Sequence, residues 1–272
     1  MRILVTGASS FVGSWFCSVA ARAGHTVLGL WHTTPLLLPE VIPVTSDLTA
    51  FRPVNVDVVV HLAAKVMSGD ALDRNRAMMD AVLSWRLPVV YGSSTVVHWD
   101  TDVAYARSRR EDEARLRASG VPWIILRPCA PYGPVHPTHR PRHVESFHRL
   151  AQLARRLPVV PVVGSPDVRR QPVHVEDFAA AALALVGRGA WDAAFDAGGP
   201  EALTMDTIVS AIAGTRRRVV GVPPGVAARL AGRAGGFQPE LVRLFTTDDV
   251  VDPAPLAQAS GVVPRPFDPA GI

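Results

Sequence analysis

Residues 1–13 read Met-Arg-Ile-Leu-Val-Thr-Gly-Ala-Ser-Ser-Phe-Val-Gly, an apolar segment that runs without a linker into a turn of small residues. The branched run at residues 3–5 is typical of a strand that is buried on both faces. The pattern after the turn predicts a helix over residues 11–22. A strand, a glycine-containing turn and a helix in direct succession open the doubly wound parallel α/β (Rossmann) sheets. The stretch therefore predicts that fold class.

The same turn predicts the place of a cofactor. Gly7 permits a tight turn, a small residue at position 10 lets backbone approach a pyrophosphate, and Gly13 lets the helix pack close to the strand. The helix would aim its free N–H groups and the positive end of its dipole at the phosphates. Small residues also close ordinary strand-to-helix turns, which is the alternative interpretation. The cofactor-binding candidates here are Gly7, Ser9, Ser10, Phe11, Val12 and Gly13.

The composition indicates a globular protein. The 272 residues, 48% hydrophobic and 19% charged, suffice for one α/β domain or for a nucleotide-binding domain with a small lobe. No apolar run is long enough to span a bilayer, and the chain opens on a strand, so we expect a cytoplasmic protein with no membrane partner. Cys17 and Cys129 lie far apart and form neither a metal-ligand spacing nor a disulfide framework.

The charge pattern favours a small anionic substrate over nucleic acid. The formal net charge is +4, and Lys65 is the only lysine, so arginine supplies nearly every cation. These arginines are scattered, and no basic stripe is interleaved with stacking aromatic residues. We therefore expect no nucleic-acid partner, and the surface charge would suit a substrate such as a phosphate ester.

The second strand, at residues 25–31, ends in Trp31 and His32. In dinucleotide folds an acidic residue at this point holds the ribose 2′-OH of NAD. Trp31 stands there instead, and no carboxylate would repel a 2′-phosphate. We expect NADP in preference to NAD, with NAD left open. The alternative is a polar loop with no cofactor role.

Further strands are expected at residues 41–45, 56–64, 89–92 and 121–126, and helices at residues 73–85 and 102–118. Asp47 follows the first of these strands, where an aspartate is usually a turn or cap residue. His61 lies inside an apolar run and is interpreted as a hydrogen-bonded core histidine. Histidines of the loop at residues 136–143 lack the spacing of a metal site, so a substrate lid or a plain loop is expected there.

The strongest chemical signal joins a strand end to a helix. Ser94 and Thr95 follow the strand at residues 89–92, and ligands of open α/β sheets bind at such carboxyl ends. Tyr105 and Arg109 lie four residues apart, so they share one face of a helix and can converge on one ligand. A nearby cation favours the ionised form of a phenol and makes it a usable proton donor near neutral pH. An ordinary packed tyrosine and a surface arginine are the alternative.

Together these features resemble the extended short-chain dehydrogenase/reductase superfamily, whose members are NAD-dependent epimerases and dehydratases and include nucleotide-sugar 4-ketoreductases. The matching segments are the Thr-Gly-x-x-x-x-x-Gly turn, the Ser94, Tyr105 and Arg109 set with Ser108 beside it, Arg127-Pro128, and residues 131–134. Ser10 stands where the family has its middle glycine, Arg109 where it has lysine, and His98-Trp99 where it has Tyr-Gly. Arginine keeps the charge but cannot relay a proton as an amine does.

The resemblance implies a site and a reaction. It implies hydride transfer between a nicotinamide and a secondary alcohol or ketone, with Tyr105 exchanging the proton, Ser94 bonding the oxygen, and Arg109 supporting the tyrosine and the ribose. It implies catalytic residues Ser94, Tyr105 and Arg109, substrate residues Ser94, Thr95, Cys129 and Arg170, and cofactor contacts that add Trp31, His32, Asp47, Leu48, Leu62, Ala63, Ala64, Tyr105, Arg109 and Pro128 to the turn. Arg170 would bind the pyrophosphate of a nucleotide sugar.

Ketoreductase, epimerase and dehydratase chemistry all remain open, as does a catalytically impaired protein that binds NAD(P) as a sensor or scaffold. No metal is expected, and the resemblance implies a homodimer. We expect a dinucleotide-binding domain over residues 1–134 with returning segments near 168–200, and a small substrate-binding lobe over residues 135–167 and 201–272.

Overall fold

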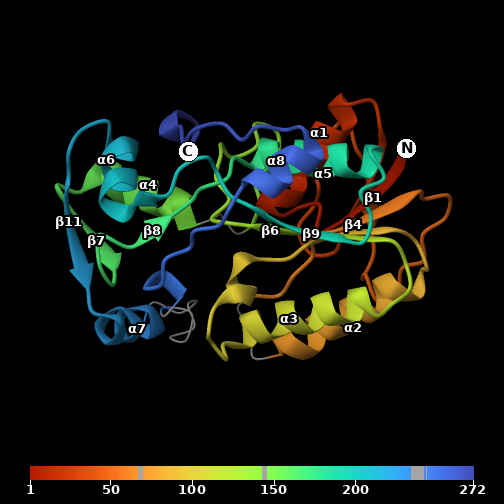
Figure 1. The fold of residues 1–272 in the computed structure, drawn as a ribbon, viewed down its shortest axis with the longest axis horizontal. Helices are drawn as coiled ribbons and strands as arrows, with labels where there is room; N and C mark the ends of the chain where they lie inside the picture. The colour runs from red at the N-terminus through yellow and green to blue at the C-terminus, as the bar shows by residue number, and fades with distance from the viewer. Residues whose placement is uncertain (67–69, 143–145, 234–241, 243) are drawn as a thin grey trace.

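The predicted doubly wound parallel sheet is confirmed. The computed structural model describes residues 1–66, 70–142, 146–233, 242 and 244–272. Seven parallel strands lie in the order β3-β2-β1-β4-β5-β6-β9 (Figure 1). Their bounds are β1 Arg2–Thr6, β2 Thr26–Trp31, β3 Ile42–Thr45, β4 Val58–His61, β5 Val89–Gly92, β6 Trp123–Pro128 and β9 Ala193–Ala197. The order reverses between β1 and β4, so their carboxyl ends form the crevice where such sheets bind ligands.

Helices cover both faces of the sheet. In Figure 1, α1 (Phe11–Arg22), α5 (Val175–Gly187) and α8 (Ala254–Ser260) lie above it, and the paired helices α2 (Ala71–Ser84) and α3 (Ala104–Arg117) lie below. Alternation along β1 explains both contacts, because Ile3 and Val5 pack in the cluster with α1 and α5, whereas Leu4 packs with α2 and α3. All three side chains are fully buried, and each such burial stabilises the fold by roughly 1.5–3 kcal/mol.

The remaining elements form a smaller unit beside the sheet. Parallel strands β7 and β11 pair with each other, and β8 pairs antiparallel with β10. The core of this unit includes Phe147, Val160, Ile208 and Tyr132. Its elements are α4 Ser146–Arg156, β7 Val159–Val163, β8 Arg169–Arg170, β10 Leu203–Thr204, α6 Met205–Ala213, β11 Arg218–Val222 and α7 Pro224–Arg233. Two further short helices are η1 Thr95–His98 and η3 Pro269–Gly271.

The predicted division between a nucleotide domain and a lobe stays a prediction. α5 and β9 both lie within the returning segment at 168–200. β9 belongs to the sheet, and α5 belongs to the helix layer with α1. α8 also contacts α5 and β9, although it lies in the segment 201–272 that we expected in the lobe. A division drawn by packing would therefore give residues 254–260 to the sheet.

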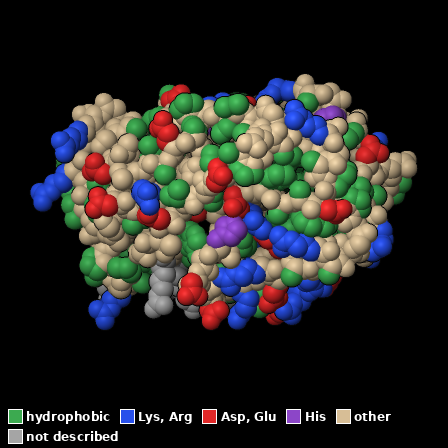
Figure 2. Space-filling model, in the orientation of Figure 1, with side chains coloured by type: hydrophobic (Ala, Val, Ile, Leu, Met, Phe, Trp, Pro, Cys, Tyr) green, Lys and Arg blue, Asp and Glu red, His purple; other side chains and the backbone are tan. Residues whose placement is uncertain are grey.

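No described helix is long and apolar enough to cross a membrane. Basic and acidic side chains are interspersed over the face drawn in Figure 2. Cys17 and Cys129 are both free and buried.

Candidate active site

Two glycines shape the turn between β1 and α1. Gly7 has a φ of +70°, and a Cβ added to it would lie 2.7 Å from the backbone nitrogen of Ala63. A Cβ on Gly13 would lie 2.2 Å from the carbonyl oxygen of Gly7. Both positions therefore exclude a side chain, and the turn approaches the end of β4 more closely than other residues would allow. This geometry agrees with the roles expected from the sequence, a tight turn at Gly7 and close packing of the helix at Gly13.

Ser10 caps the helix that follows the turn. Its Oγ accepts a hydrogen bond from the backbone N–H of Gly13 at 3.0 Å. Helix geometry leaves the N–H groups of Phe11 and Val12 without intrahelical acceptors, and α1 has no acidic residue in its first turn. The helix N-terminus thus keeps two donors and its positive dipole end for an anion, while the serine occupies a third donor.

The ends of β2 and β3 form the next part of the crevice. Trp31 is half-buried, and its Nε1 is a buried donor without an acceptor in the part of the chain that the structure describes. His32 is exposed. Asp47 accepts hydrogen bonds from the backbone N–H and the hydroxyl of Thr49, at 2.8 and 2.7 Å, and these bonds lower its pKa. Asp47 therefore closes a turn here, and the buried Leu48 follows it.

His61 links the first strand to the core. It is 1% exposed, and its Nδ1 lies 2.7 Å from the hydroxyl of Thr6. Burial, together with the charge of Arg109, lowers its pKa to about 3, so the imidazole is neutral near pH 7. The interpretation as a hydrogen-bonded core histidine is confirmed. Residues 62–64 follow directly, and the N–H of Ala63 donates to the same Thr6 hydroxyl at 3.4 Å.

Tyr105 and Arg109 come together on α3, as their spacing predicted. The guanidinium carbon lies 5.4 Å from the centre of the Tyr105 ring and 5.3 Å from that of Tyr91. Arg109 is only 2% exposed, although it was expected to reach a ribose. Burial disfavours its charge, but Tyr91, Tyr105 and Asp112 outweigh burial and raise its pKa. The arginine therefore keeps a full charge beside the phenol.

Ser94 begins η1 at the end of β5. It is half-buried, and its Oγ accepts from the N–H of Val96 at 3.4 Å. The neighbouring hydroxyls have other surroundings, because Ser93 donates to Glu113 at 2.6 Å and Thr95 is 2% exposed. Ser94 is thus the most exposed of the three residues.

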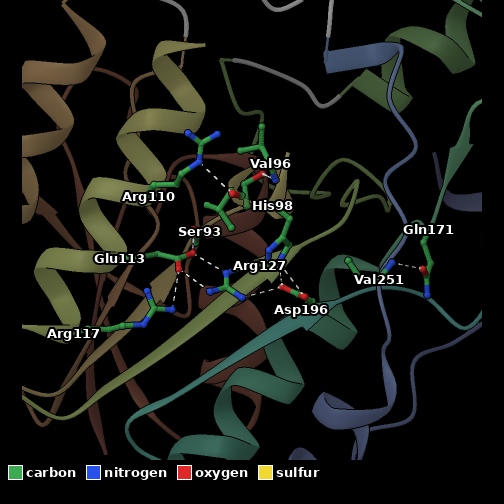
Figure 3. Close-up of polar contacts among 12 residues, drawn as sticks. Ser93, Val96, His98, Arg110, Glu113, Arg117, Arg127, Gln171, Asp196 and Val251 are labelled. Atoms are coloured by element: carbon green, nitrogen blue, oxygen red, sulfur yellow. Dashed lines mark hydrogen bonds and ion pairs between the residues drawn. The ribbon is translucent and has the colours of Figure 1, made fainter. Parts of the chain in front are cut away.

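A charged network that the sequence analysis missed joins η1, α3, β6 and β9 (Figure 3). Arg127 of β6 donates to both carboxylate oxygens of Glu113, at 2.8 and 2.7 Å, and to Asp196 of β9 at 3.2 Å. His98 lies 2.9 Å from the same oxygen of Asp196, so it ties η1 to β9. Burial alone would raise the pKa of Glu113, but hydrogen bonds from Arg127 and Ser93 hold it below its usual value.

Two further residues brace the site. Arg110 donates to the carbonyl oxygens of Val97, Trp99 and Thr101, at 2.6–3.2 Å, and so ties the segment between η1 and α3 to the helix. Asn75 of α2, 1% exposed, bonds the backbone of Lys65 and the hydroxyl of Ser108. Buried polar side chains that join two elements carry no local sequence signal.

The other predicted substrate residues, Cys129 and Arg170, are buried and bond backbone carbonyl groups. Arg170 is buried and donates to the carbonyl oxygens of Arg169 and Leu244, at 3.0 and 3.2 Å, and to that of Thr247. Cys129 donates from its thiol to the carbonyl oxygen of Asp249, and burial raises its pKa. These contacts hold the segment at residues 244–249. Pro128, the last residue of β6, is half-buried.

The loop that carries His136 and His139 packs on the glycine turn and on α1. Nε2 of His139 lies 3.0 Å from the carbonyl oxygen of Ser9, and Nε2 of His136 lies 2.9 Å from the hydroxyl of Ser18 on α1. No group of three or more His, Cys, Asp or Glu residues in the described ranges is placed to hold a metal ion.

This donor set fits a dinucleotide. The glycine cradle, the N–H groups of Phe11 and Val12, and the unpartnered Nε1 of Trp31 together offer close backbone approach and hydrogen-bond donors along one edge of the sheet.

Comparisons with known proteins agree with this geometry. The model of the NAD dependent epimerase/dehydratase family matches residues 3–114 and 90–195. The chain is 31% identical to a ceramide reductase of Caulobacter vibrioides over 200 residues, 67% of this chain and 60% of that protein. UDP-glucose 4-epimerases of Thermotoga maritima, with UDP-glucose, and Bifidobacterium longum, with NAD+ and UDP, each superpose with a TM-score of 0.77. Each is 17% identical, over 100% of this chain and 96% of the other.

Proposed function

Because the chain belongs to the NAD dependent epimerase/dehydratase family, we propose that it transfers hydride between a nicotinamide cofactor and a secondary alcohol or ketone carbon. It is an NAD-dependent enzyme of the extended short-chain dehydrogenase type. The observation that carries the proposal is the buried Arg109 cation beside the Tyr105 ring on α3. A phenol with a fixed cation beside it is the acid–base pair that reduction of a carbonyl requires.

The cofactor, when bound, supplies or takes the hydride. Gly7, Gly13 and the free N–H groups of α1 would hold its pyrophosphate. The Tyr105 hydroxyl would give a proton to the substrate oxygen on reduction and remove it on oxidation. Ser94 would donate a hydrogen bond to that oxygen, and Arg109 would stabilise the negative charge that Tyr105 carries after proton transfer.

The proposed cofactor preference is NADP over NAD. Trp31 replaces the carboxylate that favours NAD, and the exposed His32 beside it could donate to a 2′-phosphate.

The proposed substrate is a nucleotide sugar. The two UDP-glucose 4-epimerases share the fold over 96% of their length, and the family resemblance assigns Arg170 to the diphosphate of such a substrate. Most of the Arg170 guanidinium is engaged by backbone carbonyls, which favours a second candidate, a ketone without a diphosphate. The relative named ceramide reductase points the same way, although the chain spans only 60% of that protein.

Titration with NADPH and NADH, followed by nicotinamide fluorescence, tests the cofactor. A panel of UDP-sugars and long-chain ketones, followed by cofactor absorbance, then tests the substrate. Tyr105→Phe should lower turnover by about 10²–10⁴-fold while the cofactor still binds. Unchanged turnover in this variant would instead support a cofactor-binding sensor or scaffold, and no binding of either cofactor by the wild type would contradict the proposal.

We propose that the protein is a homodimer formed through α2 and α3. These helices carry ion pairs between Arg76 and Glu111 and between Arg115 and Asp80 on their outer surface, so the interface would be polar. Light scattering after size exclusion would report the mass, and a monomer would contradict this assignment.

A further inference from the structure

Arg109 places a charged guanidinium in the core at the position where the family has lysine. Its side chain is 2% exposed, and its guanidinium lies over the rings of Tyr91 and Tyr105. Removing a charge from water is strongly unfavourable unless a partner compensates it. The arginine therefore needs a counter-ion that a lysine reaching into the crevice would not need.

Asp112 is that counter-ion. Its Oδ2 lies 3.5 Å from Nη2 of Arg109, one helical turn away, and its side chain is 3% exposed. The hydroxyl of Tyr91, on β5, donates to the same oxygen at 2.9 Å. The next carboxylate of the helix, Glu113, is held by Arg127 and Arg117. Tyr91 thus orients Asp112, and Asp112 faces Arg109.

The guanidinium is held by charge and by the two rings more than by hydrogen bonds. Its Nη1 lies 3.5 Å from the carbonyl oxygen of Gly92, at the limit of hydrogen bonding. Its Nε has no acceptor among the described residues. Without Asp112, only the two rings and this long contact would fix the arginine against Tyr105.

We propose that Tyr91 and Asp112 are positioning residues that hold Arg109 against Tyr105 and adapt this active site to arginine. The inference rests on the proposed function, because its readout is cofactor binding. A lysine at position 109 would lack the planar group that stacks between the rings, and Asp112 would draw its ammonium away from the crevice. Arg109 and Asp112 should therefore be energetically coupled, and a lysine should work only when Asp112 is removed.

A double-mutant cycle tests this coupling. NADH affinity is measured by nicotinamide fluorescence in the wild type, Arg109→Lys, Asp112→Ala and the double variant, with NADPH as the second probe. Each single variant should bind about tenfold more weakly, and the double variant should return to within about threefold of the wild type. Glu111→Gln is the matched control, because Glu111 lies on the same helix and pairs with Arg76 at the surface. It should change affinity by less than about twofold.

Tyr91→Phe is a second, milder test of the same contact, because it removes one hydroxyl and keeps the ring. It should weaken binding by about threefold where Asp112 is present and have no effect in the double variant. Circular dichroism and thermal melting establish that each variant is folded. If the fold-loss of NADH affinity in the double variant equals the product of the two single fold-losses, the positioning role is wrong while the proposed function stands. If the wild type binds neither cofactor, the proposed function itself fails.

Discussion

The hydroxyl of Ser10 accepts a hydrogen bond from the backbone N–H of Gly13 at 3.0 Å, at the N-terminus of α1. A phosphate oxygen would seek the same N–H, because helix N-termini bind anions through their free donors. The serine therefore does more than add a Cβ where the family has glycine. It stabilises the helix and would compete with a bound cofactor for one donor.

Ser10→Gly should strengthen NADH binding by about threefold to tenfold, because the freed N–H can make a charge-assisted hydrogen bond. It should lower the free energy of unfolding by only a few tenths of a kcal/mol, since glycine is also tolerated at this cap. Nicotinamide fluorescence and urea unfolding measure the two effects. Ser10→Ala is the control, because it frees the N–H but keeps the Cβ. Unchanged affinity in both variants would show that Gly13 does not contact the cofactor.

The local signals of the sequence were sufficient for the fold and for part of the site. The strand–turn–helix at residues 1–22 is encoded by neighbouring residues, and so is the pairing of Tyr105 with Arg109 on one helix face. The burial of Arg109 was not predictable in this way. It depends on Tyr91, which a separate strand brings to the helix.

The network around Glu113 was also missed, for the same reason. Its partner Arg127 lies on β6, and Asp196, which shares Arg127, lies on β9, 69 residues further along the chain. Each residue alone has the pattern of an ordinary surface charge. Only the order of β5, β6 and β9 in the sheet brings them together beside Ser93 and η1.

Glu113→Gln should lower the free energy of unfolding by about 3 kcal/mol near neutral pH, because it leaves Arg127, whose side chain is only 12% exposed, without its main counter-ion. Urea unfolding followed by circular dichroism measures this loss. Glu111→Gln removes a partly exposed carboxylate of the same helix that pairs with Arg76, and it should cost less than about 1 kcal/mol. Equal losses in the two variants would mean that the network does not brace η1 and the sheet.

His61 should make the protein less stable as the pH falls below neutrality. Its pKa is about 3 in the folded state, against 6.5 for an ordinary histidine. The unfolded chain therefore gains a proton below pH 6.5 that the folded chain refuses, and the stability present above that pH is progressively lost. Between about pH 7 and pH 5 the loss should be about 2 kcal/mol.

His61→Gln should remove this pH dependence, although it also lowers stability at every pH. Because burial lowers the pKa of His136 and His174 as well, the measured quantity is the difference between wild type and variant in urea unfolding at each pH. A difference that stays constant from neutral to mildly acidic pH would contradict the assignment of a neutral, buried His61.

The proposed cofactor preference rests on the end of β2, where the indole N–H of Trp31 has no acceptor among the described residues. A carboxylate at this position would accept hydrogen bonds from the ribose hydroxyls of NADH and would repel the 2′-phosphate of NADPH. The wild type should therefore bind NADPH more tightly than NADH. Trp31→Asp should change the ratio of the two dissociation constants in favour of NADH by about tenfold to a hundredfold, as expected for hydrogen bonds to a charged group. His32→Ala is the companion variant, and it should weaken the binding of NADPH while leaving the affinity for NADH unchanged. Equal affinity of the wild type for both cofactors would overturn the proposed NADP preference, and an unchanged ratio in Trp31→Asp would place the ribose elsewhere.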